Sequence, residues 1–397
     1  MVTDSATELG APDPRQPRAT RLIFFALGFA AGAWAPLVPF AKARLALDDG
    51  ALGLLLLCLG TGSIFAMPLA GALAGRFGCR RVLLSAGLAA AGAFPWLAMA
   101  YSPILLGAAL IVFGAAIGSM DCVINIQAIA VERERGRPMM SGFHALYSLG
   151  GVVGAGAVSG MVALGLSAPV AALIVATGLL AATLIAWPGL LARGDPGGGL
   201  AFRLPHGVVV LIGVGCFILF LAEGSALDWS AVFLGTVRGA PAAEAGLAYA
   251  AFSATMTAGR IFGDRLVARA GLRRTIVAGA VIAAVGLAVA TLAPSWEVGI
   301  AGYAVLGAGC ANIVPALFTL TGRQTAMPEN AAVAAVSVLG YAGILAGPAA
   351  IGFVARATSL PTALLGVAAL LLVVSAGATR LSDLRHPGIR AADVRGP

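Results

Sequence analysis

Long apolar stretches alternate with short polar segments along almost the whole chain. A helix needs about 20 mostly apolar residues to cross a hydrocarbon core of roughly 30 Å, and we count twelve such stretches. Because a helix satisfies its own backbone hydrogen bonds, the pattern predicts an all-α integral membrane protein with twelve transmembrane helices. The spans are expected to begin near Arg21, Gly50, Val82, Pro103, Met139, Ala168, Gly207, Pro241, Thr275, Trp296, Pro328 and Leu360.

The composition agrees with a membrane protein. Of the 397 residues, 60% are hydrophobic and 11% are charged, whereas a water-soluble domain carries about 25% charged residues. This scarcity of charge excludes a soluble globule, a disordered chain and a disulfide scaffold. The formal net charge of +8 could suit nucleic acid, but the arginines lie between apolar stretches and form no basic face, so a nucleic-acid partner is excluded.

The placement of basic residues predicts the orientation, because cytoplasmic loops carry an excess of Lys and Arg. With the N-terminus in the cytoplasm, twenty basic residues fall in inner segments, four in outer segments and Arg260 inside a span. We therefore expect a multi-pass protein of the bacterial inner membrane with both termini cytoplasmic. The first span has no small-residue cleavage site and is expected to be retained.

The sequence carries no motif of a soluble enzyme. It has no P-loop, no dinucleotide fingerprint and no metal-ligand pair at helical spacing. The five cysteines fall in spans or at the end of one and are expected to pack as small apolar residues. We expect no enzymatic activity, no cofactor and no metal, and a transport process that is driven by a gradient.

An internal repeat divides the chain. The segment Gly53–Arg81 aligns without a gap with Gly246–Arg274, an offset of 193 residues, and both copies end in R-x-G-x-R-R. The same offset relates Gly114 to Gly307, Gly150 to Gly343 and Gly154 to Gly347. A register that holds over this distance predicts two parallel six-helix halves.

The turn after the second span carries the best motif, Gly71-A-L-A-Gly75-Arg76-Phe77-Gly78-Cys79-Arg80-Arg81. It resembles the G-x-x-x-D-R-x-G-R-R pattern of the major facilitator superfamily, and segments 141–151 and 222–230 resemble a little-characterised bacterial inner-membrane branch. The resemblance covers nearly the whole chain and implies two pseudo-symmetric six-helix bundles. In the family the acid of this pattern is thought to latch neighbouring helices in the outward-open state. Gly75 replaces it here, and Ala268 in the second copy.

The repeat and the polar segments predict the domain organisation. We expect a disordered cytoplasmic tail at 1–19, an N-terminal six-helix bundle at 20–192, a cytoplasmic linker at 193–206, a C-terminal six-helix bundle at 207–380 and a cytoplasmic tail at 381–397. The family resemblance implies a monomer.

Ionisable side chains inside a membrane cost a few kcal/mol each, so they are candidates for function. Asp121 and Asn125 share a helical face, and a hairpin turning near residue 135 places Asn125 level with His144 and Asp121 level with Ser148. This set is either a protonatable or substrate-binding cluster, or a hydrogen-bonded lock between two helices. The candidates for proton coupling are Asp121, His144, Glu223 and Asp228.

Glu223, near the middle of its span, is the preferred proton carrier, and a structural ion pair or helix cap is the alternative. Asp228 lies nearer the outer interface and could instead gate or cap. The substrate-binding candidates are polar or aromatic residues within spans: Trp34, Asn125, Tyr147, Trp229, Asn312 and Tyr341. Each could instead serve packing, and Trp229 could anchor at the membrane interface.

Arg260 precedes Asp264 by four residues, a spacing that predicts an intrahelical ion pair, with binding of an anionic substrate as the alternative. Small residues in segments 150–156 and 343–352 predict close helix packing, with a bend at Pro348. A gating or structural role is expected for the basic residues of the repeated turns, which are Arg76, Arg80, Arg81, Arg269, Arg273 and Arg274.

These features predict a secondary active transporter that moves a small solute by alternating access, with protons as the coupling ion. The partners are then the solute, protons and the lipid bilayer. The polar residues within spans suit uptake of a polar solute. Segment 343–348 instead resembles the G-x-x-x-G-P pattern of antiporters in the superfamily, and this resemblance together with the high apolar content implies an efflux antiporter for amphipathic compounds. A non-transporting membrane receptor is the remaining alternative, and the short tails disfavour it.

Overall fold

The computed structural model describes residues 13–192, 194 and 204–380, and their regular secondary structure is helical. The first half comprises α1 (Arg15–Trp34), α2 (Val38–Arg44), α3 (Asp49–Phe77), α4 (Cys79–Met99), α5 (Pro103–Arg135), α6 (Met140–Ala163) and α7 (Ala168–Ala186), with 3₁₀ turns at Ala35–Leu37 and Trp187–Gly189. The second half comprises α8 (Val208–Val237), α9 (Ala242–Ala245), α10 (Leu247–Ala270), α11 (Leu272–Leu292), α12 (Trp296–Cys310), α13 (Ile313–Thr321), α14 (Glu329–Ala357) and α15 (Leu360–Arg380).

The helices follow the predicted spans. In the described ranges, eleven spans are long and apolar enough to cross a membrane, where α1 with α2 and α12 with α13 each count as one span. Helix α10 coincides with the remaining predicted span but carries Arg260, Asp264, Arg265 and Arg269. Arg260 is 4% exposed, so its charge lies inside the protein, where partners can offset the cost of burying it.

The start of α1 differs from the prediction. The helix begins at Arg15 rather than near Arg21, so residues 15–19 are helical and do not belong to a tail. Pro14 and Pro17 do not prevent this, because a proline in the first turn lacks an N–H group that would have no partner there. The Asp13 carboxylate also accepts a hydrogen bond from the Arg15 N–H at 2.8 Å. Residues 1–12 of the predicted tail, most of the linker and residues 381–397 lie outside the described residues.

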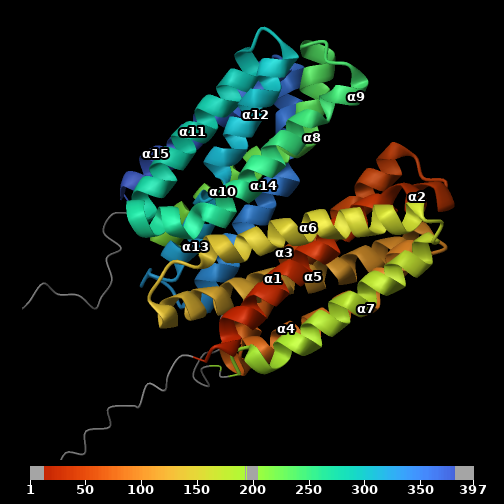
Figure 1. Cartoon of the computed structure of the whole chain (residues 1–397), viewed down its shortest axis with the longest axis vertical. Helices are drawn as coiled ribbons and strands as arrows, with labels where there is room; N and C mark the ends of the chain where they lie inside the picture. The colour runs from red at the N-terminus through yellow and green to blue at the C-terminus, as the bar shows by residue number, and fades with distance from the viewer. Residues whose placement is uncertain (1–12, 193, 195–203, 381–397) are drawn as a thin grey trace, which may run out of the picture.

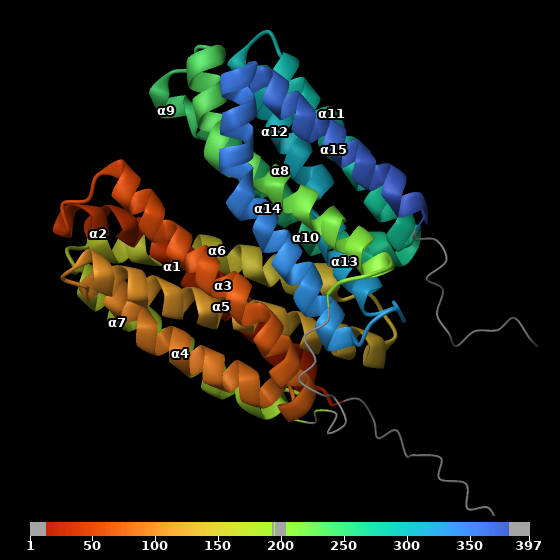
Figure 2. The same cartoon turned by 180° about the vertical axis from the view of Figure 1, so that it is seen from behind.

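The helices form two groups, α1–α7 and α8–α15 (Figures 1 and 2). Gly114 and Gly307 show that they are repeats. A Cβ atom on Gly114 would overlap the Leu59 carbonyl, and one on Gly307 would overlap the Phe252 carbonyl. Both pairs obey the offset of 193 residues, so the same close helix contact, α3 with α5 and α10 with α12, occurs in each half.

The R-x-G-x-R-R motif forms the same turn twice. Gly78 joins α3 to α4 with φ 83° and ψ 156°, and Gly271 joins α10 to α11 with φ 80° and ψ 159°. Side chains with a Cβ rarely adopt these angles, which explains the glycine in both copies.

The proximal end of the molecule is the end where α1 begins and α15 ends, and the opposite end is the distal end (Figure 1). The halves contact each other chiefly through α3 with α14 and α6 with α10. Gly71 lies against Ala334 near the proximal end, and the repeat-related Asp264 lies against Gly142. Towards the distal end the groups diverge (Figures 1 and 2).

An arginine caps a helix at the distal end of each half. Arg44 donates hydrogen bonds to the carbonyls of Leu97, Ala98 and Ala100 at the end of α4, at 3.1, 2.6 and 2.8 Å. Arg238 donates to the Thr291 carbonyl at the end of α11. Ala98 and Thr291 are related by the offset of 193. The two guanidinium groups thus satisfy carbonyls that a helix C-terminus leaves without partners.

Replacing either capping arginine with glutamine is expected to lower the free energy of unfolding by about 1–2 kcal/mol, because charged hydrogen bonds to helix carbonyls are lost. Thermal unfolding of the purified protein in detergent measures the change. Arg356→Gln is the control, since Arg356 is an exposed arginine in the last turn of α14. Equal melting temperatures for all three variants would contradict the capping role.

Candidate functional site

A buried ion pair lies in the middle of the second half and reaches the first half. The Arg260 guanidinium on α10 lies 3.5 Å from the Glu223 carboxylate on α8, and the two side chains are 5% and 14% exposed. The same guanidinium donates to the Ser148 hydroxyl on α6 at 2.7 Å. A charged contact that joins both halves at this depth can differ between conformations, and it forms the centre of the candidate site. We call Glu223 with Arg260 the central ion pair.

The predicted ion pair between Arg260 and Asp264 is not formed, and that prediction was wrong. Arg260 reaches Glu223 instead, whereas the Asp264 carboxylate accepts a hydrogen bond from the Gly142 N–H at 3.1 Å. Gly142 lies in the first turn of α6, whose N–H groups lack partners within the helix and attract a carboxylate. The spacing of four residues within α10 could not predict these partners, because they belong to other helices.

The hydrogen-bonded lock between α5 and α6 is also not formed in the described structure. The Asn125 amide donates to the Asp121 carbonyl on its own helix at 2.9 Å, and Ser148 donates to the His144 carbonyl at 3.2 Å. Helix α6 packs mainly against α1, and α5 meets α6 in few places. The polar residues of α5 and α6 that were predicted to lie at equal depth therefore do not contact each other through their side chains.

Two tyrosines bring Asp121 into the same region. Tyr147 on α6 lies within electrostatic range of Asp121, Glu223 and Arg260, and Tyr341 on α14 lies within range of Asp121 and Tyr147. The structure therefore groups Asp121 and Tyr147 of the first half with Glu223, Arg260 and Tyr341 of the second.

His144 lies within electrostatic range of Arg260, but its ring is set in an aromatic environment. Its ring is 8% exposed and packs against Phe24 and Phe318, with ring centroids 5.2 and 5.9 Å away. Its Nε2 atom has no hydrogen-bond partner. Phe318 belongs to the second half, so His144 helps to pack the halves together near the proximal end.

The other candidates occupy three further places. Trp34 is buried at the end of α1. Trp229 packs against Gly352 on α14, and the neighbouring Asp228 is exposed. Asn312 lies between α12 and α13 and donates to the Gly259 carbonyl at 3.0 Å. None of these side chains forms a hydrogen bond or ion pair with the side chains of the central ion pair, although Asn312 binds the residue next to Arg260.

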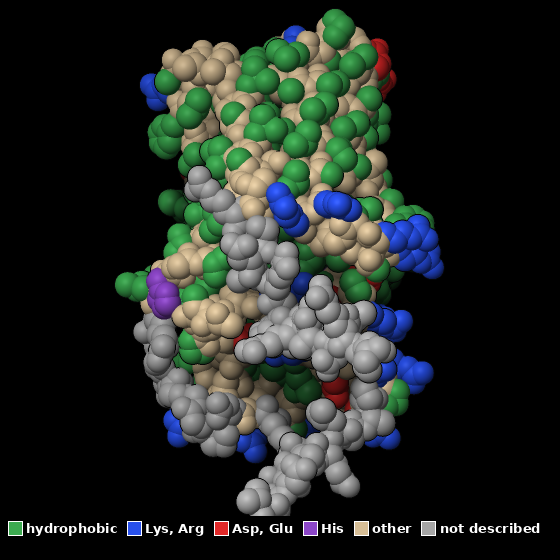
Figure 3. All heavy atoms as spheres, turned by 90° about the vertical axis from the view of Figure 1, so that its left-hand side faces the viewer, with side chains coloured by type: hydrophobic (Ala, Val, Ile, Leu, Met, Phe, Trp, Pro, Cys, Tyr) green, Lys and Arg blue, Asp and Glu red, His purple; other side chains and the backbone are tan. Residues whose placement is uncertain are grey.

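The arginines of the repeated turns have several environments. Arg80 donates to the Leu190 and Pro188 carbonyls, both at 2.9 Å, at the end of the first half. Arg76 lies over the Phe77 ring at 5.2 Å. The remaining four, which are Arg81, Arg269, Arg273 and Arg274, are exposed. Figure 3 shows basic side chains gathered on the proximal face.

A second polar cluster closes the proximal end, and sequence reasoning missed most of it. The Glu132 carboxylate accepts hydrogen bonds from the Met139 and Met140 N–H groups at 2.7 and 2.8 Å. It also accepts one from the Thr319 hydroxyl of the second half at 2.6 Å. Glu132 and Asp264 together thus serve the free N–H groups at the start of α6, one from each half.

Arg133 adds a second link between the halves. It donates to the Gly322 carbonyl at 2.7 Å and pairs with Glu329 at the start of α14. We call Glu132, Arg133, Asp264, Thr319 and Glu329 the proximal gate. The sequence signal for this gate was the alternation of acids and arginines in segment 132–135. Acidic residues are unusual in a basic loop, so they indicate that specific partners bind them.

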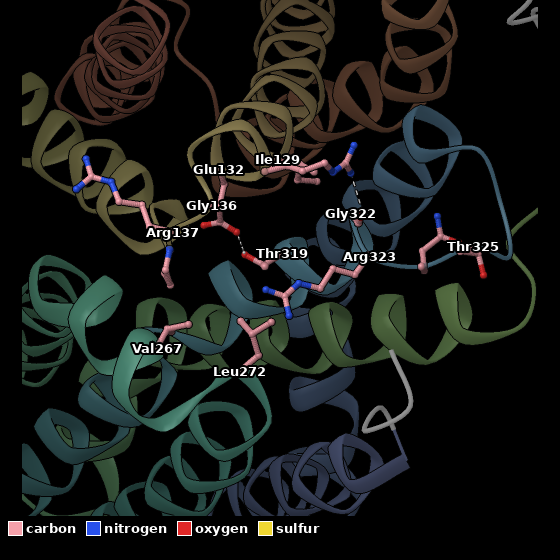
Figure 4. Close-up of a pocket in the computed structure, with 13 residues that line it drawn as sticks. Ile129, Glu132, Gly136, Arg137, Val267, Leu272, Thr319, Gly322, Arg323 and Thr325 are labelled. Atoms are coloured by element: carbon pink, nitrogen blue, oxygen red, sulfur yellow. Dashed lines mark hydrogen bonds between the residues drawn. The ribbon is translucent and has the colours of Figure 1, made fainter. Parts of the chain in front are cut away.

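A cavity of about 340 Å³ lies beside the proximal gate. It is lined from both halves by residues within segments 129–138, 267–272 and 319–325. In Figure 4, Glu132 points toward Thr319, and Arg323 extends beside them. Within the described residues, no group of three His, Cys, Asp or Glu residues could hold a metal ion.

Asp264→Ala is expected to favour opening of the proximal end, because it removes a cap that links the halves. A lost N-terminal cap corresponds to about 1 kcal/mol, or roughly fivefold in the ratio of open to closed molecules. Electron-paramagnetic-resonance distances between spin labels at Ser85→Cys on α4 and Ala278→Cys on α11, which are exposed repeat-related positions, measure that ratio in a Cys58→Ser background.

Asp48→Ala is the matched control, since Asp48 caps α3 at the distal end by accepting from the Ala51 N–H at 2.7 Å. It should reduce stability without moving the proximal labels apart. A proximal distance distribution that stays unchanged in Asp264→Ala would remove Asp264 from the gate.

The chain resembles known proteins along most of its length. The model of the major facilitator superfamily matches residues 207–393. An uncharacterized MFS-type transporter of Yersinia pestis is 50% identical over 380 residues, covering 95% of this chain and 99% of the relative. The membrane protein MosC of Rhizobium meliloti is 31% identical, covering 89% of this chain and 86% of that protein.

Solved structures share the fold at low identity. The transporter FucP in its outward conformation superposes with a TM-score of 0.78 at 18% identity, covering 92% of this chain and 98% of FucP. The proton:xylose symporter XylE superposes with a TM-score of 0.76 at 13% identity, covering 92% of this chain and 95% of XylE. At this identity the likeness concerns the fold alone.

Proposed function

This chain belongs to the major facilitator superfamily, a family of transporters rather than enzymes, and we propose that it is a proton-coupled secondary transporter of a small polar solute. The central ion pair carries this proposal. A carboxylate in the middle of a membrane-spanning helix, paired with one arginine that also contacts the opposite half, links a protonatable group to the relative position of the halves.

In this proposal the residues have distinct roles. Glu223 carries the proton, Arg260 is its counter-ion and Asp121 is a second carboxylate facing the same region. The solute binds among the polar and aromatic side chains on this level, where Tyr147 lies within electrostatic range of Asp121 and Glu223, and Tyr341 within range of Asp121. The further contacts proposed for the solute come from Trp34, Asn125, Trp229 and Asn312, and His144 and Asp228 are secondary candidates for proton transfer.

The orientation is part of the proposal. The excess of basic residues in the proximal segments supports a cytoplasmic proximal end, with both termini inside, in a bacterial inner membrane. The described conformation, joined at the proximal end and divergent at the distal end (Figure 2), is then the outward-facing state. The bundles at 20–192 and 207–380 are the bodies that rock against each other in a monomer.

Flux measurements test the function. Purified protein is reconstituted into liposomes that contain a pH-sensitive dye, and pentoses, hexoses, polyols, amino acids and carboxylic acids are added one at a time. At least one compound is expected to change the internal pH in proteoliposomes and not in empty liposomes. The sign of the pH change distinguishes uptake by symport from efflux by antiport. When solute enters the liposomes, a symporter acidifies the lumen and an antiporter makes it more alkaline.

An absence of protein-dependent pH change would contradict proton coupling. Radiolabelled uptake of the same compounds then distinguishes transport driven by another ion from a protein that transports none of them.

A further inference from the structure

The span made by α12 and α13 is interrupted, and its neighbouring residues explain why. Pro315 lacks the N–H group that would bind the carbonyl four residues earlier, which is that of Ala311. The helix stops at Cys310 and resumes at Ile313, with Ala311 and Asn312 between. The break therefore leaves a buried carbonyl that needs a different donor.

Arg260 supplies that donor. Its Nε donates to the Ala311 carbonyl at 3.3 Å, and in return the Asn312 amide donates to the Gly259 carbonyl at 3.0 Å. Two adjacent residues of α10 thus bind the two residues of the break. The remaining guanidinium nitrogens of Arg260 face Glu223 and Ser148.

Glu223 has one charged neighbour in the described structure. Arg260 is the charged group with which it interacts. The other titratable groups in electrostatic range are Cys216 on the same helix, Tyr147 on α6, Tyr249 on α10 and Cys310 on α12, and these are neutral near pH 7. A change in the charge of Glu223 therefore acts mainly on the position of the Arg260 guanidinium.

Helix α13, on the other side of the break, carries part of the proximal gate. Thr319 donates to Glu132 at 2.6 Å, and the Gly322 carbonyl, directly after α13, accepts from Arg133 at 2.7 Å. A rotation at Ala311 and Asn312 would move both groups relative to the first half. The helix is nine residues long, so it can move as a rigid piece.

We propose that Arg260 is a positioning residue that couples the charge of Glu223 to the proximal gate through the broken helix α12–α13. Loss of the Glu223 charge leaves the Arg260 guanidinium as an uncompensated charge in a buried site, and its movement out of that site releases the Ala311 carbonyl and the Ser148 hydroxyl. Helix α13 pivots at the break and withdraws Thr319 and Gly322 from Glu132 and Arg133. The inference rests on the proposed function and adds the path by which protonation opens the gate.

The first half lacks this device. The offset of 193 relates Pro315 to Cys122, within the continuous helix α5, and relates Arg260 to Met67, which is fully buried. The coupling path therefore exists in one repeat only, and proline substitutions in the first half can serve as controls.

The test uses spin-label distances between Ser85→Cys and Ala278→Cys in the Cys58→Ser background. Glu223→Gln imitates the uncharged carboxyl group and is expected to raise the ratio of open to closed proximal ends by about tenfold. Pro315→Ala restores the missing donor to the Ala311 carbonyl and makes the helix continuous. In that background we expect Glu223→Gln to change the ratio by less than about twofold.

Two further variants keep the proposal testable if the Pro315→Ala protein does not fold. Pro95→Ala, inside α4 of the first half, should leave the tenfold response intact. Thr319→Val removes the bond to Glu132 at nearly constant volume, so Glu223→Gln should add little to its effect, whereas independent sites would give additive changes.

An equal response to Glu223→Gln in the Pro315→Ala and parent proteins would overturn the coupling path, as would no response in the parent or additive effects with Thr319→Val. These outcomes leave the proposed function standing if the parent protein still moves solute with protons. Loss of that flux in the parent would instead overturn the proposed function, whatever the distances show.

Discussion

Glu223→Gln is expected to abolish proton-driven accumulation of the solute while leaving exchange of the solute across the membrane intact. Glutamine keeps the size of the side chain and an acceptor for Arg260, which lies 3.5 Å away, but it cannot carry a proton. Exchange requires rocking of the halves without net proton movement. We expect accumulation in proteoliposomes with an imposed pH gradient to fall by about tenfold or more.

Asp121→Asn and Asp228→Asn are the comparison variants for that experiment. Asp228 is exposed and five residues further along the same helix, so as a secondary candidate its replacement should lower accumulation much less than Glu223→Gln does. Asp121 has no ion-pair partner among the described residues, and its replacement is expected to weaken solute binding more than coupling. If Asp121→Asn stops accumulation and Glu223→Gln does not, the proton carrier is Asp121.

Gly114→Leu and Gly307→Leu are expected to cause the largest losses of stability, about 3 kcal/mol or more each. A Cβ atom at either position would overlap a backbone carbonyl of the neighbouring helix. Backbone cannot move aside as a flexible side chain can, so α3 would separate from α5, and α10 from α12. Unfolding of the purified protein in mixed micelles with rising denaturing detergent measures the loss.

Gly178→Leu in α7 and Gly366→Leu in α15 are the controls, because a Cβ atom there meets nothing within 4 Å. They introduce the same side chain into a membrane-spanning helix without a clash. Similar losses in all four variants would mean that the glycines act through helix propensity rather than through close packing.

The sequence was sufficient to predict the spans, the repeat and the family. Apolar runs, basic loops and glycines are local signals, and each has a direct structural cause. Gly78 and Gly271 adopt the same turn because both copies need the same backbone angles. The family assignment is confirmed by relatives that match nearly the whole chain.

The polar contacts were harder to predict because they join residues far apart in sequence. Arg260 has Asp264 one turn away, yet its partners are Glu223 and Ser148. Asn312 was assigned to an unbroken span, because the effect of Pro315 falls on a carbonyl four residues earlier. Glu132 was passed over among the loop arginines, and its role depends on the free N–H groups of α6.

The two repeats share their packing but differ in their charges, and this has a consequence for the resting state. Because the repeats are parallel, they relate the two halves at the same end of the molecule, and they do not make the proximal and distal closures equally strong. Here Asp264, Glu132 and Arg133 strengthen the proximal closure, whereas Arg44 and Arg238 each bind within their own half. Without solute, the protein is therefore expected to rest with its distal side open, so that solute binds first from that side.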